Sequence, residues 1–136
     1  MGEYKLICHD DIVYSIKEAI KSATIISNRS IKTDIIFPSY IEYESKKYIV
    51  NAIDMFFCHQ SNIKSIDFSP DSEIEAFIYN VDLCDPSSIE KITIPSSVTL
   101  LKECWCMESP KLTNIRVSPK NQRYCYFDEK MIIGKS

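Results

Sequence analysis

The feature that most constrains this chain is a short pattern that occurs three times. In each copy an aliphatic residue is followed three positions later by an isoleucine, then two positions later by an apolar residue with a proline close behind. The copies begin at Ile63, Ile89 and Leu112, so successive starts lie 26 and 23 residues apart. A unit this short cannot bury its apolar face alone and has to stack on its neighbours. We therefore expect a coil of stacked units whose function belongs to a surface built by several of them.

The spacing also predicts which type of coil forms. Repeats of roughly 20 to 29 residues are typical of leucine-rich-repeat solenoids, in which each unit contributes one short strand to a parallel sheet. Residues at the same phase of successive units should lie one above another, and alternate residues of a strand should point inward. The sequence therefore predicts two inward ladders, formed by Ile66, Ile92 and Ile115 and by Phe68, Ile94 and Val117.

The first 30 residues carry a different pattern. Asp10 and Asp11 suit the N-cap of a helix. After them, apolar residues recur at three- and four-residue spacing: Ile12, Val13, Ile16, Ala19, Ile20 and Ala23. Such a stripe is typical of a helix that covers the first apolar layer of a repeat stack, although a partner-binding helix has the same pattern. We predict an N-terminal helical cap over residues 1–30 and a solenoid of about four units over residues 31–136.

Two β-hairpins are expected to flank the repeats. One joins the strands around Ile41 and Val50 through the polar stretch 44–47, and the other joins residues 124–127 to residues 131–134. The predicted fold is thus an α+β repeat: a leucine-rich-repeat solenoid with short parallel strands, irregular return segments, a capping helix and flanking hairpins. No polar helix closes the C-terminal end, which favours a further repeat or a second subunit there.

Composition excludes several classes of function. The net charge of −3 gives no basic footprint for nucleic acid. The only glycines are Gly2 and Gly134, so no glycine-rich loop can cradle a phosphate, and no cofactor is expected. No apolar run approaches the roughly 18 residues of a membrane span, and residues 1–14 lack the apolar core of a signal peptide. These features favour the cytoplasm.

The six cysteines raise two alternatives to a packing role, namely a metal site and a catalytic thiol. Cys58 and Cys84 both stand five residues before a leading isoleucine, which is typical of reduced thiols that recur in a core. The pair Cys104 and Cys106 lacks the spacing of a zinc site, so no metal is expected. A hydrolase that uses Cys106 or Cys125 as its nucleophile is a distant alternative, because no local signature places a base beside either thiol. We expect no catalytic residue and no enzyme.

Polar residues between the inward positions form a grid on the predicted sheet. Its members are Lys64, Ser65, Asp67, Glu90, Lys91, Thr93, Thr113, Asn114 and Arg116. Solenoids use such surfaces to dock proteins because the identity of these side chains is free of core constraints. A partner protein across Asp67, Thr93 and Arg116 is the functional hypothesis, and plain solvation of a polar face is its competitor.

Two stretches resemble a known family. Residues 37–53 are similar to the opening unit of BspA-like leucine-rich-repeat proteins, and Ile92-Thr93-Ile94-Pro95-Ser96-Ser97-Val98-Thr99 resembles their internal consensus. The resemblance extends over about residues 35–127, with Lys102, Cys106 and Ser109 where the family carries Gly, Phe and Cys. It implies a non-catalytic protein-interaction module. The family's surface-associated members imply a cell-surface adhesin or host-interaction protein, whereas the missing export signal favours an intracellular scaffold.

Overall fold

The structure is a computed structural model that describes residues 4–55, 62–78, 88–101, 109–128 and 131–134, with side chains left undescribed in residues 125–128 and 131–134. The described residues form strands and turns, with no α-helix among them. They build a seven-stranded sheet in the order β1-β2-β3-β6-β8-β10 with β5 also paired to β6, a four-stranded sheet in the order β11-β9-β7-β4, and the hairpin β12-β13.

The predicted N-terminal helix is wrong, because this segment is an antiparallel meander. Its strands are β1 (Lys5–His9), β2 (Ile12–Lys17) and β3 (Ser22–Asn28). Asp10 and Asp11 have φ angles of 50° and 63° and make the tight turn between β1 and β2, a backbone region that Asp tolerates and that two-residue hairpin turns require. Ile20, assigned to the apolar stripe, lies in the β2–β3 turn and is 66% exposed. The β-branched residues of β2 and β3 favour strands. The spacing of the apolar residues in this segment is compatible with the period of a helix and also with that of a strand.

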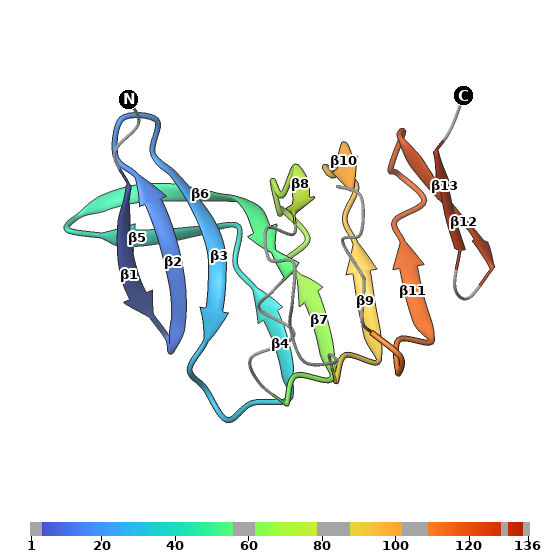
Figure 1. The fold of residues 1–136 in the computed structure, drawn as a ribbon. Helices are drawn as coiled ribbons and strands as arrows, with labels where there is room; N and C mark the ends of the chain where they lie inside the picture. Colours follow the sequence, from blue (N-terminus) through green and yellow to red (C-terminus); the bar gives the residue numbers. More distant parts are fainter. Residues whose placement is uncertain (1–3, 56–61, 79–87, 102–108, 129–130, 135–136) are drawn as a thin grey trace.

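The repeated pattern forms a parallel sheet, as predicted. Figure 1 shows its strands side by side: β4 (Asp34–Phe37), β7 (Ser65–Phe68), β9 (Lys91–Ile94) and β11 (Asn114–Val117). The register places Ile92 beside Ile66 on one side and Ile115 on the other, and all three are buried. Ile94 likewise lies beside Val117. Ile35 and Phe37 of β4 extend the two ladders through their pairing with Ile66 and Phe68.

The return segments contain short strands of their own, in contrast to the irregular path expected from the sequence. The end of β6 (Lys46–Asp54), β8 (Ala76–Ile78) and β10 (Leu100–Leu101) pair in parallel. The core lies between this layer and the repeat sheet. The Phe68 ring links the two layers, with its centroid 5.6 Å from that of Phe37 and 5.8 Å from that of Phe77. Phe57, Leu83 and Cys106, predicted to repeat on the return side, lie outside the described residues.

The turns that follow the prolines are tied from unit to unit by polar side chains. The Ser39 hydroxyl donates to a carboxylate oxygen of Asp71, at 3.0 Å, and the Ser97 hydroxyl donates to the carbonyl of Ile74, at 2.6 Å. The buried Asn121 amide donates to the carbonyls of Pro95 and Val98, at 2.8 and 3.1 Å. These bonds hold successive units in register at the C-terminal ends of the repeat strands.

Both predicted hairpins are confirmed. β5 (Tyr40–Tyr43) pairs antiparallel with β6 around a turn at Glu44 and Ser45, whose φ angles are 50° and 65°. β12 (Tyr124–Asp128) pairs antiparallel with β13 (Met131–Gly134). Figure 1 places β12 and β13 beyond β11, at the end of the repeat sheet away from the N-terminal meander.

Candidate functional site

In each strand of the repeat sheet, alternate side chains point away from the core. Within each strand the residues beside the buried positions are exposed or half-buried, as the two-residue period of a strand requires. The register aligns them across the strands, with Lys91 between Ser65 and Asn114 and with Arg116 beside Thr93. We call this surface the outer face; it consists of Asp34, Ile36, Ser65, Asp67, Lys91, Thr93, Asn114 and Arg116.

A further row of the predicted grid precedes the strands. Lys64, Glu90 and Thr113 are exposed, and their backbones form a chain of hydrogen bonds. The Glu90 N–H donates to the Lys64 carbonyl at 2.7 Å, and the Thr113 N–H donates to the Glu90 carbonyl at 3.1 Å. All nine residues of the predicted grid therefore lie on or directly before the aligned strands. Their role in binding stays a prediction.

Asp34 is the best-positioned acidic group of the outer face. Its carboxylate accepts hydrogen bonds from the Ser65 hydroxyl at 2.6 Å and from the Thr33 hydroxyl at 3.1 Å. These two bonds, with a smaller contribution from the positive charges of Lys64 and Lys91, lower the pKa of Asp34 below its usual range. The outer face thus carries a fixed negative charge at its β4 end.

The remaining charged side chains of the outer face form no ion pair with other described residues. Among the described residues, the one ion pair within 4.0 Å is the local contact of His9 with Asp10, so Asp67, Lys91 and Arg116 make none there. Asp67 accepts only the N–H of its neighbour Phe68, at 2.8 Å, among the hydrogen bonds of the described side chains. Acidic groups therefore lie on β4 and β7, and basic groups lie on β9 and β11.

Sequence reasoning missed the contribution of β4 to this surface. Ile36 lies beside Asp67 in the register and is 70% exposed, and Asp34 lies beside Ser65. Ile36 thus adds a large exposed apolar side chain to a sheet surface that is otherwise polar. The signal was present, because Ile35 and Phe37 stand two residues apart before Pro38, like Ile92 and Ile94 before Pro95.

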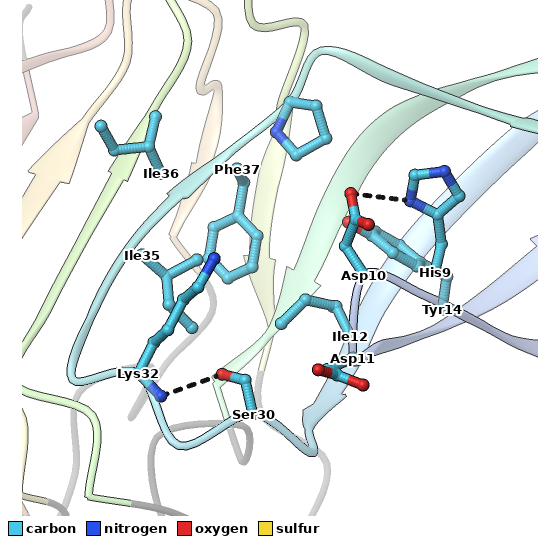
Figure 2. A pocket seen from close by; sticks show the side chains of 11 residues that line it. His9, Asp10, Asp11, Ile12, Tyr14, Ser30, Lys32, Ile35, Ile36 and Phe37 are labelled. Atoms are coloured by element: carbon cyan, nitrogen blue, oxygen red, sulfur yellow. Dashed lines mark hydrogen bonds and ion pairs between the residues drawn. The ribbon is translucent and has the colours of Figure 1, made fainter.

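A cavity of about 250 Å³ lies beside β4. Figure 2 shows its walls, which are residues of β4 on one side and the β1–β2 turn with Ile12 and Tyr14 on the other. Nδ1 of His9 lies 3.5 Å from the Asp10 carboxylate, and the Lys32 N–H donates to the Ser30 hydroxyl at 3.3 Å. Burial, followed by the charge of Asp10, raises the pKa of the Tyr14 phenol far above its usual value. The cavity therefore combines an apolar floor with carboxylates at its rim.

The thiols can be placed only in part. Cys8 lies exposed on β1 with a free thiol. Cys58, Cys84, Cys104 and Cys106 lie outside the described residues, and the side chain of Cys125 is not described. In the described ranges, no three residues among His, Cys, Asp and Glu gather closely enough to hold a metal ion. None of the described segments forms a helix of the length and apolarity needed to cross a bilayer.

Comparisons with known proteins find solved structures that are similar to this chain at low sequence identity. No protein-family model matches the chain, and no curated protein matches it. A leucine-rich repeat protein from Bacteroides capillosus is 16% identical, with a TM-score of 0.48 over 83% of this chain and 98% of that one. A leucine rich cell surface protein from Faecalibacterium prausnitzii is 12% identical, with a TM-score of 0.42 over 97% of this chain and 59% of that one.

A third solved structure, the pneumococcal vaccine antigen PcpA, is 14% identical with a TM-score of 0.30, over 99% of this chain and 55% of that one. This chain thus spans just over half the length of the second and third structures. Because all three TM-scores are below 0.5, the assignment of the fold depends on the ladders and registers of the chain itself. These registers give the chain a leucine-rich-repeat type of fold.

Proposed function

We propose that this chain is a non-catalytic protein-interaction module of the BspA-like leucine-rich-repeat type whose partner docks on the outer face. The observation that carries the proposal is the alignment of exposed Asp67, Ile36 and Arg116 on hydrogen-bonded parallel strands. A rigid sheet loses little conformational entropy when it binds, which favours affinity. Charged groups with no ion partner in the described residues provide specificity.

The charge distribution specifies the kind of partner that fits. The outer face is acidic at Asp34 and Asp67 and basic at Lys91 and Arg116, so a complementary protein surface carries basic residues over β4 and β7 and acidic residues over β9 and β11. An apolar side chain of the partner would cover Ile36, which is 70% exposed.

The proposal is tested with a triple variant of the outer face. Asp67→Ala, Thr93→Ala and Arg116→Ala together keep the net charge and remove side chains from three neighbouring strands. A matched control carries Glu42→Ala, Thr99→Ala and Lys17→Ala, which are also exposed but lie on other elements. Proteins captured by the natural chain should be lost from the outer-face variant and retained by the control.

The affinity for a captured partner is then measured with purified proteins by titration calorimetry. We expect the outer-face variant to bind at least about thirtyfold more weakly, because two or more contacts of about 1 to 2 kcal/mol each are removed. Equal affinity of the natural chain and the outer-face variant would place the binding site elsewhere.

The place where the module acts distinguishes two forms of the proposal. An intracellular scaffold is protected when intact cells are treated with a protease, whereas a cell-surface adhesin or host-interaction protein is cleaved. The same measurement on lysed cells controls for the intrinsic sensitivity of the chain.

A further inference from the structure

Strand β1 forms an open edge of the seven-stranded sheet. In the described part of the chain it pairs with β2 alone, and Figure 1 shows it on the side of β2 that faces away from β3. Open edges expose unpaired backbone groups and are natural templates for another strand. Many edges are protected by a charged side chain or a proline, but β1 has neither in its middle, where Leu6, Ile7 and Cys8 follow one another.

The geometry of the β1–β2 turn decides which backbone groups face outward. In a hairpin with a two-residue turn the flanking residues exchange both hydrogen bonds, and here these residues are His9 and Ile12. Hydrogen-bonded pairs then alternate, so Lys5, Ile7 and His9 turn their backbone groups toward β2. Leu6 and Cys8 turn their N–H and C=O groups toward the open edge.

The side chains beside this edge are apolar. Tyr4 and Leu6 are 67% and 61% exposed, and Cys8 is exposed on the same face because alternate residues of a strand share a face. Ile20, 66% exposed, lies in the turn at the same end of the meander as Tyr4. Ile7 points the other way into the core and is 8% exposed. A partner strand would therefore gain both backbone hydrogen bonds and apolar contact.

We propose that β1 pairs antiparallel with β1 of a second copy of this chain, with a two-fold axis at Ile7. A symmetric interface has to be self-complementary, and β1 meets this condition because it begins with the basic Lys5 and is followed by the acidic Asp10 and Asp11. The antiparallel arrangement places Lys5 of each copy opposite His9 and near the acidic turn of the other. Leu6 and Cys8 then exchange hydrogen bonds with Cys8 and Leu6 of the other copy.

Neighbouring registers fit less well. An axis at Cys8 would place Leu6 opposite the Asp10 carboxylate, and an axis at Leu6 would place Lys5 opposite Ile7, away from the acidic turn. The Lys5 ammonium lies 5.1 Å from the Tyr43 ring centroid and is exposed, so an acidic group of the other copy can reach it. Because one added strand buries less surface than a stable dimer needs, the association belongs to the weak, reversible class.

The first experiment is sedimentation equilibrium of the 136-residue chain in reducing buffer over a series of concentrations. The variant Leu6→Lys places a charge on the exposed apolar edge, and Ile31→Lys makes a similar change at an exposed residue between β3 and β4. We expect the natural chain and I31K to dimerise with the same constant and L6K to associate at least roughly tenfold more weakly. A natural chain that stays monomeric, or equal weakening by L6K and I31K, would overturn the proposal.

The register is tested by cross-linking. In L6C the new thiol should form a disulfide with Cys8 of the other copy, detected by mass spectrometry after oxidation of mixed ¹⁵N-labelled and unlabelled chains. The control S15C carries a thiol beside Leu6 but on β2, one strand in from the edge. Cross-linking of S15C equal to that of L6C would rule out pairing through β1. Dimerisation through β1 is independent of binding at the outer face, so either can fail without the other.

Discussion

Ile92→Ala is the most direct test of the stacked core. Ile92 is fully buried in β9, between Ile66 and Ile115 of the adjacent strands. The substitution removes three carbons, which corresponds to a transfer free energy of about 2.4 kcal/mol at ~0.8 kcal/mol per buried carbon. The paired strands on both sides prevent the cavity from collapsing, so the total cost should reach about 3 to 4 kcal/mol.

Urea unfolding followed by far-ultraviolet circular dichroism measures this loss. The midpoint should fall while the slope of the free energy of unfolding against urea stays unchanged. A thermal scan should show a melting temperature lower by roughly 10 to 14 °C for a chain of this size. Ile36→Ala makes the same change at the exposed outer face and should cost less than about 0.5 kcal/mol. If the two variants differ by less than about 1 kcal/mol, Ile92 does not lie in a close-packed ladder.

Two further predictions concern single buried groups. Asn121→Ala removes an amide that donates to the Pro95 and Val98 carbonyls and accepts from the N–H groups of Arg123 and Tyr124. The free energy of unfolding in urea should therefore fall by about 2 to 4 kcal/mol. The control Asn114→Ala on the outer face should lower it by less than about 0.5 kcal/mol. Equal losses would show that the amide does not tie the turns together. The raised pKa of Tyr14 means that the folded state retains the phenol proton more strongly than the unfolded state, so stability should fall as the pH rises above about 10. Tyr14→Phe should show a smaller fall, measured by urea unfolding at neutral and alkaline pH; an identical fall in both proteins would contradict the buried, neutral phenol.

The sequence determined the repeat sheet well because its signal is redundant. Ile66, Ile92 and Ile115 recur at one phase, and a proline follows the strand in every copy, so strand, inward face and register could be inferred together. The outward positions followed from the same alternation. Asp34 and Ile36 were missed because the β5–β6 hairpin lengthens the first unit and interrupts the period. The use of the outer face in binding and the division of the chain at residue 30 stay predictions.

The N-terminal error has a physical origin. Apolar residues spaced like Ile12, Ile16 and Ala23 satisfy a helix, but they also satisfy two strands joined by a short turn. The decisive information was in the backbone preference of Asp10 and Asp11, which take positive φ angles in the turn instead of capping a helix. Contacts between successive units, such as that of Asn121 with Pro95, leave no local signal in the sequence.

Strand β6 links the two parts of the molecule. Its first half pairs with β5, while further along it lies between β3 of the meander and β8 of the return layer. Tyr48, Val50 and Ile53 of this strand are buried. Local unfolding from either terminus therefore either stops at β6 or unfolds the whole protein. Because both parts share this strand, the chain should melt as a single cooperative unit although it contains two different sequence patterns.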